Sequence, residues 1–326
     1  MKRALFVTVI GLLAVVGCRD SAPTSEPSKP TPVTVEKPAT VGKTAPPAKA
    51  PEADPWTKAP TAKDPLPHPL FWSIEKDGIT SYALGTIHVG VDAEARLPQV
   101  VWDKLDAAKA FAMETDLADP SLAKILECTN CSLKKELGDA YWKKLEDELT
   151  PPVASRIEAM KPMVAATMMS MRGLPQTTQM DTLLLARAQR AHKQIVFLEE
   201  AAAEAAILEK WMDAKALKAM LDDIAGSEQH TKDMLAAYLA GDEKVMIKLS
   251  EDEKTDALKH GYSAKEFEES MQDMLYGRNA AWIAGIQKMH AAGGGFIAVG
   301  AMHLVGPKNV LELLATAGYT IKRVTP

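Results

Sequence analysis

Two segments near opposite ends of the chain repeat the same order of residue types. Residues 82–88 (YALGTIH) and 297–303 (IAVGAMH) each contain an apolar run of β type, a glycine and, three positions later, a histidine. A proline-led helical pattern and another apolar run follow each of them, within 98–114 and 307–324. A glycine at the end of a buried strand allows the backbone to turn sharply or to approach another segment closely. The repeat therefore predicts two strand–Gly-x-x-His–helix–strand units, each with a histidine at the end of a strand.

The rest of the pattern predicts how these units are joined. The Asp77-Gly78 pair between two short β-type runs, 70–75 and 79–84, is a strong hairpin signal. From 117 to 290 apolar residues recur at helical spacing, and the run 194–198 interrupts them as a short strand. We therefore predict an α/β (α+β) fold, with a central mixed β-sheet built from both chain ends and a large, mostly helical insertion between them.

The first 18 residues have the layout of a bacterial lipoprotein signal peptide. Lys2 and Arg3 precede an apolar stretch, and residues 15–18 (VVGC) resemble a lipobox. This pattern predicts cleavage before Cys18 and attachment of lipid to that residue, which places the protein in the bacterial cell envelope, at the periplasmic face or at the outer membrane. An ordinary signal peptide or a membrane anchor is the alternative, but the apolar run is shorter than the roughly 20 residues of a spanning helix.

Residues 19–67 are rich in proline, alanine and lysine and contain no aromatic residue before Trp56. Such a segment cannot bury enough apolar surface to fold, so we expect a disordered tether. Residues 68–326 are long enough for one α/β domain with its insertion. The net charge is −5 and the basic residues are interspersed with acidic ones, so no nucleic-acid-binding surface is expected. The sequence leaves the oligomeric state open.

Apart from Cys18, the chain contains only Cys128 and Cys131. In an exported protein, a Cys-x-x-Cys pair is a redox centre, half of a metal site or a small structural disulfide. No further thiolates are present to complete a zinc ribbon, and a helical pattern rather than a thioredoxin-like strand precedes the pair. We expect a structural disulfide between Cys128 and Cys131, with redox chemistry as the weaker alternative.

His88 and His303 are expected to share one site, because histidines at the ends of neighbouring strands are common metal ligands and acid–base groups. Glu114 ends the apolar run 110–114, where a carboxylate without a partner would be unfavourable. A divalent cation held by His88, His303 and Glu114 would satisfy all three and leave a position for water. Such a metal lowers the pKa of bound water, so the pattern predicts hydrolysis. The alternative is that the two histidines only pack in the core.

Three further polar residues have ambiguous patterns. Glu199 follows a strand as Glu114 does, and is a ligand, a base or a residue that interacts with the dipole of the next helix. Asp181 opens a helical pattern, where aspartate is also a preferred N-cap. Arg278, in YGRNAAW, would hold a carboxylate or a developing oxyanion in a cleft, or form an exposed salt bridge. We expect no role for the histidines in the tether or in polar helical patterns: His68, His192, His230, His260 and His290.

The strings ALGTIHVG, METD, IVFLEE, YGRNAAW and FIAVGAMHLVGPKNVLELLATAGYTIKRV resemble the TraB/GumN family. The resemblance covers about residues 69–324, and its terminal motifs are the specific ones. That family is similar to the Tiki proteins that cleave Wnt and to the pheromone-shutdown protein TraB/PrgY. It is more distantly similar to the haem-binding ChaN fold and the erythromycin-esterase fold.

The resemblance implies a metal-dependent hydrolase of peptidase type that acts on a peptide or protein, with manganese or cobalt, or else zinc. On this chain it assigns His88, His303 and Glu114 to the metal or catalytic set, with Arg278 as a polar support. The alternatives are a non-catalytic envelope lipoprotein that binds a ligand such as haem, or a protein partner, in the same cleft, and a protein whose helical insertion makes a regulatory contact. Bound metal together with turnover distinguishes the enzyme from these alternatives.

Overall fold

The computed structural model describes residues 60–326. The predicted signal peptide, the predicted lipidation site Cys18 and most of the predicted tether lie outside the described residues. The end of that tether contacts the domain, because the backbone N–H groups of Lys63 and Leu66 donate to carbonyls of helix α1 (Ala93–Arg96) at 3.0 and 2.7 Å. No helix within 60–326 is both long enough and apolar enough to cross a membrane.

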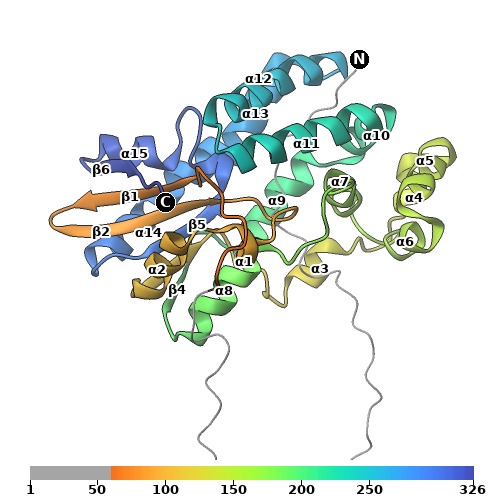
Figure 1. The fold of residues 1–326 in the computed structure, drawn as a ribbon. Coiled ribbons are helices and arrows are strands. Elements are labelled where there is room, and N and C mark those ends of the chain that lie inside the picture. The colour runs from red at the N-terminus through yellow and green to blue at the C-terminus, as the bar shows by residue number, and fades with distance from the viewer. Residues whose placement is uncertain (1–59) are drawn as a thin grey trace, which may run out of the picture. The chain divides into compact units, whose positions relative to one another are not determined.

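The described part contains one sheet and many helices (Figure 1). The strands are β1 (Phe71–Lys76), β2 (Ile79–Thr86), β3 (Ala110–Met113), β4 (Gln194–Phe197), β5 (Phe296–Gly300) and β6 (Thr320–Arg323). The other helices are α2 (Gln99–Ala107), α3 (Leu122–Leu126), α4 (Leu133–Leu137), α5 (Asp139–Leu149), α6 (Pro151–Arg156), α7 (Pro162–Ser170), α8 (Met180–Arg190), α9 (Ala201–Trp211), α10 (Ala214–Asp222), α11 (Ile224–Ala240), α12 (Glu243–Lys259), α13 (Ala264–Met271), α14 (Gly277–Ala291) and α15 (Val310–Thr316), with a π-helix η1 (Gln272–Tyr276) and a 3₁₀ turn η2 (Ala301–His303).

The sheet confirms the predicted mixed sheet built from both chain ends. Its order is β4-β3-β5-β2-β1-β6. The four strands from β4 to β2 are parallel, whereas β1 is antiparallel to both β2 and β6. Figure 1 shows the N-terminal strands in orange beside the C-terminal ones in blue, while helices α4–α6 of the insertion lie away from the sheet.

Strands β2 and β5 carry the two Gly-x-x-His motifs and lie next to each other in parallel register, with Thr86 opposite Gly300. From β2 the chain continues through α2 to β3, on the far side of β5. From β5 it continues through α15 to β6, in the opposite direction across the sheet. Connections that leave neighbouring parallel strands in opposite directions create the crevice in which α/β proteins bind ligands, beyond the carboxyl ends of the strands.

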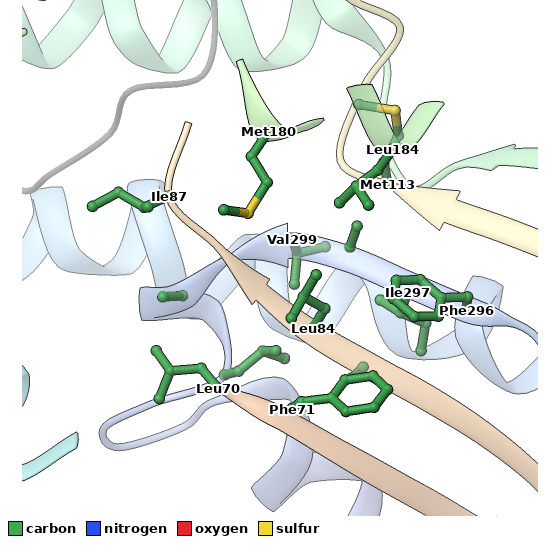
Figure 2. Packing of buried hydrophobic residues seen from close by; sticks show 14 of the residues in the cluster. Leu70, Phe71, Leu84, Ile87, Met113, Met180, Leu184, Phe296, Ile297 and Val299 are labelled. Atoms are coloured by element: carbon green, nitrogen blue, oxygen red, sulfur yellow. The ribbon is translucent and has the colours of Figure 1, made fainter. Parts of the chain in front are cut away.

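The core below this crevice is apolar and tightly closed. Most residues of the two central strands, β2 and β5, are buried because helices or neighbouring strands cover them, as in parallel sheets. Figure 2 shows Met180 of α8 reaching toward Val299 of β5, with Leu84 of β2 below it. The buried strand ends are therefore a firm support for the residues that follow them.

A second apolar cluster holds the insertion together, built from residues such as Leu133, Trp142 and Leu217. Cys128 and Cys131 lie at its edge, between α3 and α4, and are joined as a disulfide with their Cα atoms 5.6 Å apart. The backbone N–H of Cys128 also donates to a carbonyl at Ala159. The pair therefore links a short loop within the insertion, away from the strand ends.

Candidate functional site

His88, His303 and Glu114 converge on Gly300, the last residue of β5. A Cβ atom built on Gly300 would lie 3.2 Å from Glu114 Oε1, 3.6 Å from His303 Cδ2 and 3.7 Å from His88 Nε2. All four residues line one pocket of about 510 Å³. The expectation that the two histidines meet beside a carboxylate therefore agrees with the geometry, and a side chain at position 300 would intrude among them.

His88 is held from behind by Asp181. The Nδ1 atom of His88 lies 2.6 Å from Asp181 Oδ2, and the other carboxylate oxygen accepts a 2.7 Å hydrogen bond from the hydroxyl of Thr86. Burial lowers the pKa of His88, but the charge and hydrogen bond of Asp181 outweigh it and raise the pKa to about 9. Nδ1 therefore donates to Asp181, and Nε2 is the atom directed at Gly300.

Asp181 is not an N-cap, although the sequence left that alternative open. Helix α8 begins at Met180 with Gln179 in the capping position, and no side-chain hydrogen bond caps it. The backbone N–H of Met180 donates instead to the carbonyl of His88 at 3.2 Å. The start of α8 thus binds both the backbone and the side chain of His88.

His303 is oriented by Asn279 in a matching way. The amide nitrogen of Asn279 donates to the carbonyl of Lys308 at 3.0 Å, so its oxygen faces His303 Nδ1 at 2.6 Å. An amide oxygen can only accept, so His303 carries a proton on Nδ1 and a lone pair on Nε2. Burial lowers the pKa of His303 to about 3, which keeps the ring neutral. Trp282 covers the ring, with the two ring centres 4.4 Å apart.

Glu114 enters the site as an ionised carboxylate. Its Oε1 accepts the backbone N–H of Gly300 at 2.6 Å, and its Oε2 accepts Nη2 of Arg278 at 2.8 Å. Burial raises the pKa of Glu114, but the positive charges of Arg278 and His88 and the hydrogen bond from the backbone N–H of Gly300 lower it below its ordinary value. Its Oε2 also lies 3.8 Å from Nε2 of His303.

Arg278 joins three glutamates in the interior. Its Nη2 contacts Glu114, Glu199 and Glu204, its Nε donates to Glu199 at 3.0 Å, and its Nη1 donates to the carbonyl of Met274. Burial opposes its charge, but the three carboxylates raise the pKa of Arg278 further. Arg278 is therefore a buried link between the carboxylates and not an exposed salt bridge.

The two remaining glutamates both have raised pKa values. Burial raises the pKa of Glu199 despite its bonds to Arg278, and it raises the pKa of Glu204 to about 8. Oε2 of Glu204 has no hydrogen-bond partner in the described part of the chain. Glu204 is thus neutral near pH 7, which reduces the negative charge gathered around one arginine.

The π-helix η1 sets the position of Arg278. It ends at Tyr276, and Gly277 and Arg278 open α14 directly after it. A Cβ on Gly277 would lie 2.9 Å from the carbonyl oxygen of Gln272, which is backbone and cannot move aside easily. π-helical turns inside helices are rare and occur often at functional sites. From this position Arg278 donates both to Glu114 and to the carbonyl of Met274 within η1.

The residue types and ring orientations of the predicted metal ligands suit a divalent cation, but the distances between their ligand atoms suit it less well. Both histidines direct Nε2 inward while Nδ1 is held by an acceptor, the arrangement of metal-binding histidines. His303 Nε2 and Glu114 Oε2 are 3.8 Å apart, but each accepts from a nitrogen of Arg278, at 3.4 and 2.8 Å, so an ion shared by the two would have to displace the guanidinium. His88 does not complete a compact set with these two residues. Within residues 60–326, the one group of three acidic or histidine side chains whose ligand atoms all lie within 4.8 Å of one another is Glu114, Glu199 and Glu204. Arg278 already contacts an oxygen of each of those three glutamates.

Sequence reasoning missed several polar residues that support the site. Glu204 carried a signal, because it is the one charged residue in the apolar string AAAEAAIL from 201 to 208. Asn279 adjoins Arg278 but gave no pattern of its own. Tyr238, whose hydroxyl donates to the carbonyl of Gly85 at 2.9 Å, lay among ordinary helical residues.

Two histidines that were expected to lie in polar surroundings are buried. His230 lies 2.9 Å from Glu253, and His290 lies 2.9 Å from the hydroxyl of Ser81. Both make polar pairs in the interior, and neither lines the pocket around Gly300. Their helices present more than one face to the protein, so the polar residues around them in the sequence were a poor guide to burial.

The sequence of this chain is similar to known proteins. The pattern of the TraB/PrgY/gumN family matches residues 70–323, which include every residue of the site described above. Among curated proteins, the uncharacterized protein YbaP of Shigella flexneri is 28% identical over 244 residues, covering 72% of this chain and 87% of YbaP. No solved structure matches the chain.

Proposed function

Because the chain belongs to the TraB/PrgY/gumN family, we propose that it is a metal-dependent hydrolase of peptidase type whose active centre is the pocket around Gly300. The observation that supports this most directly is that both imidazoles line one pocket with Nδ1 held from behind. His88 and His303 follow adjacent strands, and each is anchored through Nδ1. Nε2 of His88 faces Gly300, whereas Nε2 of His303 faces Arg278 and Glu114. The buried His230 and His290 also have polar partners, but neither lines this pocket, so the distinguishing feature of His88 and His303 is their convergence beside Glu114.

In this proposal His88, His303 and Glu114 hold a divalent cation, manganese or cobalt, with zinc as a further candidate. When bound, such an ion lowers the pKa of water and polarises a carbonyl group, which is the chemistry that peptide hydrolysis requires. To bind an ion, His88 would have to lose the proton on Nε2, and Nε2 of His303 would have to exchange the hydrogen bond that it accepts from Arg278 Nη1 at 3.4 Å for the ion. Asp181 and Asn279 then keep the two rings in position.

Arg278 and Glu199 have supporting roles in the same proposal. Arg278 donates to Glu114 Oε2 and leaves Oε1 to the backbone N–H of Gly300, so the direction of the carboxylate is fixed from two sides. Glu199 holds Nε of Arg278 and thereby prevents the guanidinium from rotating. Since the N–H groups of Arg278 are engaged with these partners and Met274, we assign it positioning of Glu114 and not oxyanion binding.

Metal analysis and a cleavage assay on the same samples test the proposal. Residues 60–326 are loaded with manganese, cobalt or zinc, dialysed, and assayed with a library of internally quenched peptides. We expect one ion per chain and cleavage in the wild type, and loss of both in His88→Ala and His303→Ala. Glu114→Gln should lose cleavage by a factor of 100 or more, on the order of the effect of removing an essential catalytic group.

His68→Ala is the matched control, because His68 is exposed and lies outside the pocket. It should keep both the ion and the activity. Absence of any bound ion after all three loadings would contradict the ligand assignment. An ion that stays bound without any cleavage would contradict the hydrolase and favour a binding protein.

The sequence of the first 18 residues supports a proposal on location. We propose that the mature chain begins at lipid-modified Cys18 and is tethered to a membrane of the bacterial cell envelope. Labelling of the full chain with radioactive palmitate in cells tests this. Label in the wild type and its loss in Cys18→Ala are expected, and equal labelling of the two would overturn the proposal.

A further inference from the structure

A second pocket adjoins the candidate active centre. This side pocket, of about 790 Å³, lies between α12, the α13–η1 segment and the loop that follows His303. Leu275 and Met302 line both the side pocket and the pocket around Gly300. Met302 is the residue before His303, and Leu275 precedes Arg278 by three positions. The two pockets are therefore separated only by side chains that belong to the segments of the site.

The inner walls of the side pocket are apolar. They include Ile247, Phe267, Met271, Leu275 and Met302. Methionine side chains adapt their shape to what they contact, which suits a pocket that receives ligands of different outline. An apolar wall gains free energy by covering apolar surface and would penalise an unpaired charge.

Charged residues also line the pocket, and two of them form an ion pair. Lys254 Nζ lies 2.5 Å from Glu268 Oε1, and both side chains are largely exposed. Glu251 lines the pocket as well and is exposed. Because these charged groups face solvent, the apolar lining is the part of the pocket that favours a large apolar group.

We infer that the side pocket receives a large apolar side chain, of leucine, methionine or phenylalanine size, from the substrate peptide next to the bond that is cleaved. The inference rests on the proposed function for the peptide nature of the substrate. The walls that the two pockets share, Leu275 and Met302, place this side chain close to His303.

Narrowing the side pocket tests the inference. Ile247 is half-buried on α12 and lies close to Gly306 at the pocket wall, so Ile247→Trp places a large ring inside it. Ser250→Trp, three residues further on the same helical face, narrows it from a second point. Lys248→Trp is the matched control, since Lys248 is exposed on the same helix and does not line the pocket.

The assay uses internally quenched peptides of alanine and glycine in which one leucine is moved through the sequence. We expect the best leucine peptide to lose at least about tenfold in kcat/KM in Ile247→Trp and Ser250→Trp, as for loss of a hydrophobic subsite. The all-alanine peptide should stay within about twofold, and Lys248→Trp should match the wild type for both peptides. Equal kcat/KM for the leucine peptide in the wild type and both pocket variants overturns the inference while leaving the hydrolase intact.

A binding measurement without turnover separates the two proposals. Every peptide of the leucine series is made with photoreactive leucine and irradiated with metal-free protein, and the crosslinked residues are mapped by mass spectrometry. Crosslinks to α12 or 267–276 that disappear in Ile247→Trp support the side pocket, even if no metal restores cleavage and the hydrolase proposal fails. Crosslinks to other segments only, or crosslinks unchanged in Ile247→Trp, overturn it.

Discussion

Nδ1 of His88 lies 2.6 Å from Oδ2 of Asp181, 93 positions further along the chain. This contact decides the charge of His88 and the direction of its Nε2. Asp181→Asn keeps the shape of the side chain and removes its charge, so above about pH 9, where the wild-type His88 has also lost its proton, we expect divalent-metal affinity to fall about 10- to 100-fold, as for other partners of metal-binding histidines. Isothermal titration with manganese and cobalt measures this.

Asp242→Asn is the control for that substitution. Asp242 caps α12 by accepting the backbone N–H of Val245, and asparagine caps a helix about as well as aspartate does. Metal affinity should be unchanged in Asp242→Asn. If the two variants bind the ion equally well, Asp181 does not support a metal ligand.

Metal binding should depend on pH through His88. The charge of Asp181 raises the pKa of His88 to about 9 against the effect of burial, so below that pH the ion must displace a proton from Nε2. His303 contributes nothing to this dependence at neutral pH, because burial lowers its pKa to about 3. Affinity should therefore rise about tenfold per pH unit up to about pH 9 and then level off, following one proton.

The same titrations in Asp181→Asn provide the check. Without the aspartate charge the pKa of His88 falls, so the plateau should begin at a lower pH. A wild-type affinity that stays constant between pH 6.5 and 8.5 would be inconsistent with proton displacement from His88.

Gly277 is needed for the turn that positions Arg278. In Gly277→Ala the new Cβ would meet the carbonyl oxygen of Gln272 at 2.9 Å, so the π-helical turn must rearrange. We expect cleavage activity to fall at least about tenfold, because misplacement of a supporting residue by about 1 Å has effects of that size or larger. The peptidase assay and a thermal melt measure the two consequences.

Gly285→Ala is the matched substitution in the same helix, where the new Cβ would make only an ordinary 3.6 Å contact with Leu198. Alanine is favoured over glycine in a helix by about 1 kcal/mol, so this variant should be slightly more stable and fully active. Equal activity of the two variants would show that the turn is not required.

The buried pair of His230 and Glu253 makes stability depend on pH away from the site. Burial raises the pKa of Glu253 from 4.5 to about 7, although His230 opposes it. A raised pKa adds stability that is complete below pH 4.5 and is lost as the pH rises through about 7. In Glu253→Gln this loss is removed, so the variant should gain about 2–3 kcal/mol relative to the wild type between pH 5 and pH 8.

Urea unfolding at both pH values measures that difference. Glu251→Gln, an exposed glutamate on the same helix, should follow the wild type at both. The same pH dependence in the wild type and in Glu253→Gln would contradict the assignment.

Much of the fold followed from local patterns. The hairpin at Asp77-Gly78, the strand near 194–198 and both Gly-x-x-His units could be predicted because strand and helix periodicity and glycine positions reflect burial and backbone geometry close by in the chain. That β2 and β5 are adjacent was an expectation from the likeness of their motifs, and the sheet order confirms it.

The polar partners did not follow from such patterns. Glu199 and Asp181 each had more than one interpretation from the sequence, and in the structure Glu199 binds Arg278 and Asp181 binds His88. Glu204 and Asn279 were not singled out at all. Their roles depend on which helix end reaches which strand end, and one sequence contains no direct signal for that.

The sequence by itself determined the two strand–Gly-x-x-His–helix–strand units and the sheet shared by the chain ends, since both arise from short-range burial patterns. Only the tertiary structure decided that Asp181 holds His88, that Asn279 holds His303 and that Arg278 binds Glu114 across 164 positions. The physical reason is that a buried polar group must find a partner within hydrogen-bond distance, and the packing of distant helices determines which partner is near enough.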